Sequence, residues 1–268
     1  MRATDAARMQ FKEEIPLDIK LMNITATLVF AAVVLMLIGS LIWWGISHPV
    51  FSISQIVVLG SSQHNNEVTL RANVTPKING NFFTIDLVHT RAIFESVPWV
   101  RHAIIEREFP NQLNIQIVEH QPVAYWGPES ESRLLNSAGE VFVANFDELE
   151  NTKLPHLYGS DSQSTLVLQM YGEVSLRLKK LDLSIKGLEL TGRGSWRALL
   201  QSGADIELGR GTVTEVMARL DRMTSTLVQV AGRYNRKVSA LESADLRHEN
   251  GYALRLRGVS TLEPALKK

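Results

Sequence analysis

The sequence predicts an α+β protein that begins with one transmembrane helix. Three observations lead to this prediction: a long uncharged apolar run near the N-terminus, a strand-helix-helix-strand-strand order in residues 47–120, and many short strands with two or more helices in residues 121–258. The last region predicts a mainly antiparallel β domain. The chain has 268 residues, 45% hydrophobic and 21% charged, which is the composition of a globular protein of one or two domains.

Residues 23–46 form the predicted membrane-spanning helix. No Asp, Glu, Lys or Arg occurs between Lys20 and Glu67. At about 1.5 Å per residue, the run spans about 34 Å from residue 24 onward, enough to cross a hydrocarbon core of about 30 Å. Trp43 and Trp44 stand at its end, where indole rings prefer the interface between lipid and water.

Two other interpretations of this run are a buried core helix and a cleaved signal peptide. A core helix rarely stays free of charge and of amphipathic patterning over such a length. A signal peptide has a shorter apolar region that ends at small residues, unlike Trp43-Trp44-Gly45. A transmembrane helix therefore explains the run best.

Basic residues on the two flanks predict the orientation of the helix. Arg2, Arg8, Lys12 and Lys20 precede it, whereas residues 44–70 contain no Lys or Arg. Basic flanks stay on the cytoplasmic side of a membrane. We therefore expect residues 1–22 to form a cytoplasmic tail, the protein to be single-pass type II, and the remainder to be exported.

Residues 47–120 predict a small domain with a three-stranded sheet covered by two helices. The expected elements are a strand at 52–60, helices at 67–74 and 86–97, and strands at 100–109 and 113–117. Asp86 is a suitable N-cap for the second helix, and Pro98 ends it. Such a unit is too small for a catalytic cleft of its own.

Residues 121–258 predict short strands interrupted by helices, followed by a tail at 259–268. The expected elements are a hairpin of 133–135 with 140–143, a β-rich run at 165–168, a helix at 176–185, a strand at 187–190, and a hairpin over 196–208 that turns near 202–203.

The last predicted helix and hairpin have clear local signals. Thr212 and Glu215 have capping-box spacing, and apolar residues follow at steps of four and three, namely Val216, Leu220, Met223, Leu227 and Val230. Two strands, 241–248 and 252–256, are then joined at Asn250-Gly251, which is a strong hairpin signal.

Composition and motifs give no support for catalysis or for cofactors. Lys plus Arg and Asp plus Glu each number 28, so no excess of positive charge favours nucleic acid. The chain has no cysteine, its seven histidines lack metal-binding spacing, and no Gly-x-Ser-x-Gly elbow occurs. Two Gly-Arg-Gly runs, at 192–194 and 209–211, fit turns and helix entry better than phosphate cradles. We therefore predict no enzyme, no cofactor, no metal and no small-molecule substrate.

The final strand is a candidate docking edge. Strand alternation places Tyr252, Leu254 and Leu256 on one face, and Ala253, Arg255 and Arg257 on the other. An unpaired edge can accept a strand from a partner protein. The same arginines could instead protect the edge against pairing, and the residues alone leave both interpretations open.

Several motifs, taken in order behind a single span, resemble the FtsQ/DivIB family of bacterial division proteins. The most specific stretch runs from Trp99 to Trp126 and includes Phe109-Pro110 and Pro122-Val123-Ala124-Tyr125-Trp126. The supporting pieces are Ile56 to Gly60, the hairpin from Asn136 to Phe142, Leu154-Pro155, Leu208-Gly209-Arg210-Gly211 and Asp245-Leu246-Arg247. The resemblance implies a POTRA domain at 47–120 and a β domain at 121–258.

The resemblance implies a scaffold of the divisome at the septum of the cell inner membrane, which links early and late division proteins. Its β domain would bind FtsB, paired with FtsL, to control septal wall synthesis, and its POTRA-like domain would contact other divisome membrane proteins. The implied partner-binding residues are Arg247, His248, Asn250 and Gly251, with Tyr252 and Leu254 of the edge strand and Arg193 as a second basic contact. The family commonly has an aromatic residue where His248 stands.

Two alternatives come from other classes of protein. One is a membrane-tethered periplasmic hydrolase, which would be revealed by cleavage of peptidoglycan or peptide substrates. The other is a POTRA-containing secretion or assembly factor. Such factors usually carry an outer-membrane barrel, and no series of long alternating strands after Gln121 predicts one.

Overall fold

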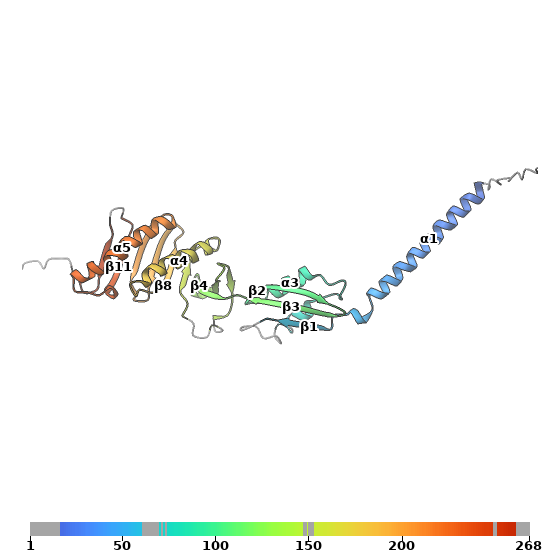
Figure 1. Ribbon diagram of the computed structural model, residues 1–268, viewed down its shortest axis with the longest axis horizontal. Coiled ribbons are helices and arrows are strands. Elements are labelled where there is room, and N and C mark those ends of the chain that lie inside the picture. The colour runs from blue at the N-terminus through green and yellow to red at the C-terminus, as the bar shows by residue number, and fades with distance from the viewer. Residues whose placement is uncertain are drawn as a thin grey trace, which may run out of the picture.

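The structure, a computed structural model, describes residues 17–60, 70, 72, 74–146, 149, 153–248 and 251–260. It is elongated, with a long helix at one end, a small three-stranded sheet in the middle and a nine-stranded sheet at the other end (Figure 1). We call the middle part, from Pro49 to Glu119, the membrane-proximal domain, and the part from Pro122 to Leu256 the distal domain. The predicted α+β class is confirmed.

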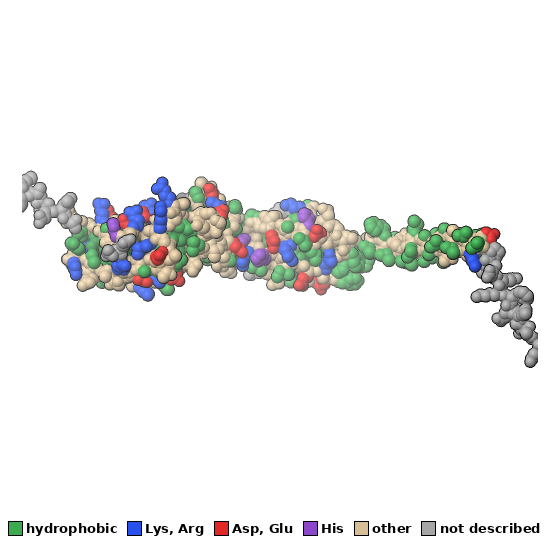
Figure 2. All heavy atoms as spheres, turned by 90° about the horizontal axis from the view of Figure 1, so that it is seen from above, with side chains coloured by type: hydrophobic (Ala, Val, Ile, Leu, Met, Phe, Trp, Pro, Cys, Tyr) green, Lys and Arg blue, Asp and Glu red, His purple; other side chains and the backbone are tan. Residues whose placement is uncertain are grey.

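Helix α1 (Leu17–Ile46) has two charged residues near its start, Asp18 and Lys20, and none from Leu21 to Ile46. It is long and apolar enough to cross a membrane, and none of its residues is buried in the protein. Hydrophobic side chains cover it in Figure 2. It begins six residues before the predicted span, at Leu17 rather than at residue 23, because Leu17 to Met22 continue the helix toward the N-terminus.

The membrane-proximal domain has the predicted order of elements. Strands β1 (Gln55–Leu59), β3 (Gln112–Glu119) and β2 (Val100–Glu108) lie side by side in that order. β1 runs parallel to β3, and β2 runs antiparallel to it. Helix α3 (Leu87–Glu95) begins at the predicted cap, where the Asp86 carboxylate accepts hydrogen bonds from the amides of Val88 and His89.

The helix predicted at 67–74 falls mostly outside the described residues. The positions that are described, 70, 72 and 74, are helical. Leu70 and Val74, four residues apart, are both buried in the core of the membrane-proximal domain. Apolar side chains at this spacing share one face of a helix.

The distal sheet is mixed but mainly antiparallel. Its strand order is β12-β11-β10-β9-β8-β7-β4-β5-β6, and only the pairs β4–β7, β7–β8 and β10–β11 are parallel. The strands are β4 (Pro122–Trp126), β5 (Arg133–Asn136), β6 (Val141–Val143), β7 (His156–Tyr158), β8 (Ile185–Leu190), β9 (Ser195–Leu200), β10 (Asp205–Arg210), β11 (Leu241–Asp245) and β12 (Ala253–Leu256). Short 3-10 helices lie at Pro49–Phe51, Thr75–Lys77, Glu129–Glu131, Asp161–Gln163 and Val238–Ala240.

Helices α4 (Ser164–Lys179) and α5 (Val213–Arg233) pack side by side against one face of this sheet. The capping box of Thr212 and Glu215 opens α5 as predicted. The α5 stripe from Val216 to Leu227 is buried. These helices leave the opposite face of the sheet uncovered by any described helix.

Two predictions in this region are wrong. The run at 165–168 is not β-structure but the first turn of α4, and the helix predicted at 176–185 ends at Lys179, before β8 begins at Ile185. The buried side chains of α4 are Val167, Met170, Val174 and Leu178, at steps of three and four. Packing of this stripe on the sheet outweighs the β preference of Thr165 and Val167. The intrinsic preference of a residue for helix or strand is a weak determinant once one face of the segment is buried.

Aromatic side chains pack at the junction of the two domains. Trp99, immediately before β2, is almost fully buried against Leu134, Phe142 and Ala144 of the distal domain. Its ring centroid lies 5.5 Å from that of Phe142, and His120 stacks on the same ring at 4.1 Å. Phe142 of the distal domain is thus in contact with both Trp99 and His120.

A polar network surrounds this aromatic cluster. Arg101 of β2 donates two hydrogen bonds to Glu140 of the distal domain, at 2.7 and 3.0 Å. The amide nitrogen of buried Asn136 also donates to Glu140, at 2.7 Å, and lies 2.8 Å from Nδ1 of His120. These donors, Arg101 first, lower the pKa of Glu140 to about 2.

The pKa of Glu140 predicts acid sensitivity at the junction. A carboxylate whose pKa is depressed by folding stabilises the folded state above its ordinary pKa of 4.5, and this contribution is lost as the pH falls toward 2. We expect Glu140→Gln to be less stable than the native chain at pH 7 and to lose less stability between pH 5 and pH 2. Urea unfolding across this range measures both effects. Glu106→Gln, which removes an exposed carboxylate of β2, is the matched control and should keep the native pH profile.

Candidate partner-binding site

Strand β12 forms one edge of the distal sheet. It pairs antiparallel with β11, where Ala244 lies opposite Leu254 and Asp245 opposite Ala253. No described strand lies on its other side. Backbone groups that point outward from such an edge can pair with an added strand.

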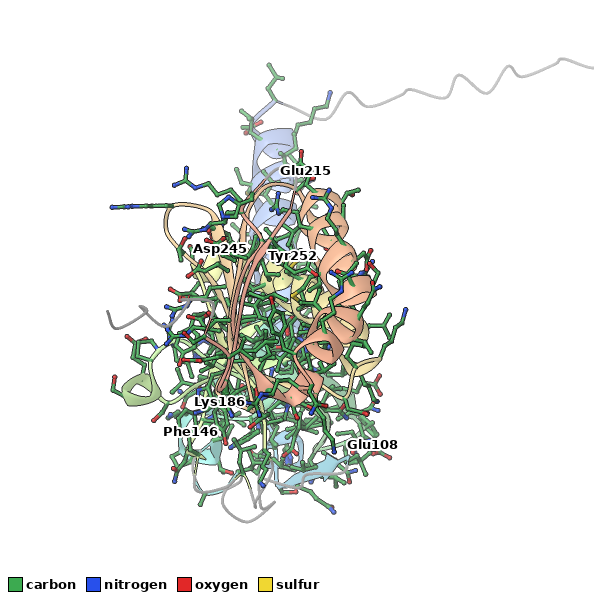
Figure 3. The ribbon with its side chains drawn as sticks, turned by 90° about the vertical axis from the view of Figure 1, so that its left-hand side faces the viewer. Glu108, Phe146, Lys186, Glu215, Asp245 and Tyr252 are labelled. Carbon is green, nitrogen blue, oxygen red and sulfur yellow. The ribbon has the colours of Figure 1, made fainter. Side chains whose placement is uncertain are left out.

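The two faces of β12 differ as predicted. Leu256 is buried, and Tyr252 and Leu254 are half-buried on the side toward α5, where the Tyr252 hydroxyl hydrogen-bonds with that of Thr226. Ala253 and Arg255 are exposed on the other side. Arg255 forms an ion pair with Glu242 at 3.3 Å. Figure 3 shows Tyr252 between the strands and the helix, and Asp245 on the opposite side of the hairpin.

A shallow groove follows the edge strand on its helix side. It is lined by Val230, Tyr234, Tyr252, Leu254, Arg255, Leu256, Val259 and Ser260. Tyr234 is half exposed, and most of the other linings are apolar. We call it the edge groove. A strand that paired with β12 could insert every second side chain, if apolar, into this groove.

Five arginines converge on a second groove on the uncovered face of the sheet, which we call the arginine groove. They come from the β8–β9 turn, from strands β9 and β10, from α5 and from the segment after β11, and they are Arg193, Arg197, Arg210, Arg219 and Arg247. Glu189 and Glu207 are the acidic side chains of the lining. The excess of guanidinium groups fits an acidic partner.

Three of these arginines, Arg197, Arg219 and Arg247, are held by other groups of the sheet and its turns. Arg197 binds the Asp205 carboxylate through both Nε and a terminal nitrogen, which raises the pKa of the guanidinium. Arg219 donates to the carbonyl of Leu208 at 3.0 Å. Exposed Arg193 and Arg210 make no ion pair or side-chain hydrogen bond with any described residue, so they are available to a partner.

Arg247 is fixed beside the β11–β12 hairpin. It donates to both carboxylate oxygens of Asp245, at 2.8 and 2.6 Å, and lowers the pKa of that carboxyl to about 2. Its side chain is nevertheless more than half exposed. Gly209 has a left-handed backbone, φ 81°, and a Cβ there would lie 3.0 Å from Cγ of Arg247. Glycine at 209 therefore makes room for the Arg247 stem.

Because Asp245 offsets the charge of Arg247, we expect Asp245→Asn to accelerate association with an acidic peptide at low salt. The amide keeps an oxygen that can accept from the Arg247 backbone amide but removes one negative charge. Stopped-flow association rates at increasing ionic strength measure the effect, which salt should screen. Asp221→Asn, on the helix side of the sheet, removes the same charge and should leave the rate unchanged. An equal acceleration by both variants would contradict a local role for Asp245.

The structure brings some of the predicted partner-binding residues together. Arg193 and Arg247 line the same groove. His248 is exposed next to Arg247, and Gly251, Tyr252 and Leu254 belong to the terminal hairpin. A further hollow lies on the outer face of β10–β12. It shares Glu207 with the arginine groove and includes Leu254 of the terminal hairpin, so it links the arginines to the hairpin residues. Asn250 lies outside the described residues.

Sequence reasoning missed Arg197, Arg210 and Arg219. Arg210 lies in a Gly-Arg-Gly run that was interpreted through its glycines, and these do form a bulge and the entry to α5. The position of the arginine itself depends on the order β8-β9-β10-β11, which no local pattern encodes. Within the described ranges, no cluster of His, Asp and Glu could hold a metal ion.

Comparison with known proteins assigns both folded parts. Residues 51–120 match the family model "POTRA domain, FtsQ-type", and residues 124–247 match "Cell division protein FtsQ/DivIB, C-terminal". A protein of Thiomonas arsenitoxydans named Cell division protein FtsQ is 35% identical over 248 residues, 92% of this chain and 90% of its own. A protein with the same name from Burkholderia pseudomallei is 32% identical over 91% of this chain and 96% of its own length. Another from Bordetella pertussis is 33% identical over 89% of this chain and 92% of its own length.

Proposed function

Because the chain belongs to the FtsQ/DivIB family of cell division proteins, we propose that it is a non-catalytic scaffold that holds other division proteins together. It is a single-pass membrane protein of the division machinery, and α1 is its membrane-spanning helix. The basic residues before α1 support a cytoplasmic N-terminus and a periplasmic location for both domains. We place it in the cell inner membrane, concentrated at the division septum.

The proposed division of the chain is that of the sequence prediction. It comprises a tail at 1–22, a span at 23–46, a POTRA domain at 47–120, a β domain at 121–258 and a tail at 259–268. The two family matches, at 51–120 and 124–247, support the central part. Trp43 and Trp44, exposed near the end of α1, are proposed to lie at the membrane interface.

We propose that the β domain binds an FtsB/FtsL-type complex along β12. The observation that carries this proposal is an edge strand that pairs with no described strand on its outer side, together with the arginine groove, whose Arg247 follows β11 in the terminal hairpin. A partner segment in extended conformation would pair with β12, place apolar side chains in the edge groove and direct acidic ones toward Arg247, Arg193 and Arg210. His248, Asn250 and Gly251 would contact it at the turn.

The same arrangement suggests how the scaffold acts on septal wall synthesis. Binding at β12 would hold FtsB, and through it FtsL, at the septum. The scaffold would control septal wall synthesis by placing these proteins there, and not by catalysing a reaction. The POTRA domain would contact other membrane proteins of the divisome, which links early and late components.

Backbone methylation of the partner tests strand addition without altering the protein. The full chain, in lipid nanodiscs, is titrated with synthetic periplasmic segments of the cognate FtsB-like protein that carry one N-methylated residue each. In an added strand, alternate amides point toward the edge. We expect methylation at every second position to abolish binding, and methylation at the positions between to be tolerated.

Equal tolerance at all positions would exclude strand addition. Absence of binding by the unmodified segment would overturn the proposed partner site. Hydrolysis of peptidoglycan or peptide substrates by the purified chain would instead support the membrane-tethered hydrolase.

A further inference from the structure

Four phenylalanines form a cluster at the end of the membrane-proximal domain that adjoins α1. Phe51 lies in the 3-10 helix Pro49–Phe51, Phe82 and Phe83 lie in the loop before α3, and Phe109 follows β2. The ring centroid of Phe51 is 4.9 Å from that of Phe83 and 6.1 Å from that of Phe109. Phe82 lies 5.2 Å from Phe83 and 5.8 Å from Phe109. We call these four side chains the aromatic patch.

The aromatic patch is not part of the domain core. Phe109 is 70% exposed and Phe83 46%, and neighbouring Val50 is 53% exposed. Phe51 and Phe82 are half-buried beneath them. Phenylalanine has no polar group to bind water, so clustered, exposed rings of this kind mark a surface that another apolar phase covers.

The patch is tied to the end of the transmembrane helix by hydrogen bonds. The side-chain amide of Asn81 donates to the carbonyl of Ile46, the last residue of α1, at 2.8 Å. The adjacent amide of Phe82 donates to the carbonyl of Phe51, also at 2.8 Å. In Figure 2 hydrophobic side chains extend without a break from α1 onto this end of the domain. The rings are therefore held where α1 leaves the membrane.

The surrounding sequence is almost free of charge. No Asp, Glu, Lys or Arg occurs from Leu21 to Asn66 or from Ile78 to Ile85. Glu108 precedes Phe109, but its carboxylate accepts hydrogen bonds from the side chains of Gln112 and Asn114, at 2.7 and 2.6 Å. Protein–protein interfaces surround their apolar centre with a polar rim. A patch without charged side chains can enter the bilayer interface without the cost of burying an ion.

We propose that the aromatic patch inserts into the interfacial region of the lipid bilayer that α1 spans, and so holds the membrane-proximal domain against the membrane surface. Aromatic rings are favoured at this depth, between headgroups and acyl chains. Trp43 and Trp44, near the end of α1, would occupy the same layer. The domain then has two attachments, the helix and the patch, which restrict its rotation about α1. The proposal depends on α1 crossing the membrane but not on partner binding at β12.

The absence of native cysteine allows a direct test with single labels. Phe109→Cys, in the full chain, is labelled with a bimane fluorophore and placed in nanodiscs that contain phosphatidylcholine with a nitroxide near the headgroup. We expect quenching several-fold stronger than for Leu176→Cys, an exposed apolar position on α4 of the distal domain. Phe83→Cys serves as a second probe if the first variant is misfolded by circular dichroism.

Two outcomes would overturn the proposal. Quenching at 109 and 83 no stronger than at 176 would show that the rings do not reach lipid. Weak lipid quenching, together with dipolar broadening between two copies spin-labelled at 109, would assign the patch to contact with a second copy of this chain.

Discussion

Arg247→Glu is expected to weaken binding of the FtsB-like segment by at least about 2 kcal/mol, about thirtyfold in dissociation constant. The change removes a guanidinium from the arginine groove and places a second carboxylate beside that of Asp245, so that both face an acidic partner. The bidentate geometry of Arg247 is specific to arginine, so Arg247→Lys should give an intermediate loss. Isothermal titration with the full chain in nanodiscs measures both variants.

Arg91→Glu is the control for this experiment. Arg91 is an exposed residue of α3 in the membrane-proximal domain, and its reversal changes the net charge by the same amount. It should bind the segment with native affinity. If Arg247→Glu binds as tightly as Arg91→Glu, with both variants folded, the arginine groove is not the site.

Trp99→Ala is expected to destabilise the chain by about 3–5 kcal/mol, the usual range for loss of a large buried aromatic side chain. Trp99 is 2% exposed and packs on Phe142 across the domain junction. Its backbone is left-handed, with φ 71°, a conformation that favours glycine. Trp99→Gly should therefore be about 1 kcal/mol less destabilising than Trp99→Ala, although it removes the same ring. Chemical denaturation of the purified chain compares them.

The same substitution should loosen the contact between the domains. Spin labels at Val88→Cys on α3 and Leu176→Cys on α4, both exposed positions, report the interdomain distance. We expect one narrow distance distribution in the native chain and a broad one in Trp99→Ala. An unchanged, narrow distribution would show that Arg101 and Glu140 fix the junction without Trp99.

The elements that the sequence predicts correctly have local signals. Asp86 caps α3 and Thr212 caps α5 through bonds to amides two or three residues away. The two strands of the predicted terminal hairpin do pair, but β11 ends at Asp245 and not at residue 248, and Asn250 lies outside the described residues. The start of α4 was missed because the β-branched residues at 165 and 167 dominate a short window, whereas burial against the sheet decides their conformation.

The candidate site depends on more distant parts of the chain. Arg193 and Arg247 are 54 residues apart and meet because β11 pairs in parallel with β10 after the α5 crossover. Resemblance to the family selected those two residues as partner contacts. It included Arg210 only as part of a motif, without a role, and it did not include Arg197 or Arg219. The junction of Trp99 with Phe142 was missed for the same reason, since pairing between domains has no periodicity along the chain.

The position of β12 determines how far from the membrane a partner must extend to bind it. In Figure 1 the terminal hairpin lies in the part of the molecule farthest from α1, beyond the whole length of the first domain. Because contacts of Trp99 and Glu140 join the two domains, we expect the domains to act together as a spacer between α1 and the terminal hairpin. A partner anchored in the same membrane must carry a stalk long enough to match that spacer before its strand can pair. Shortening such a stalk should abolish the complex in the membrane while leaving the affinity of the isolated segments intact.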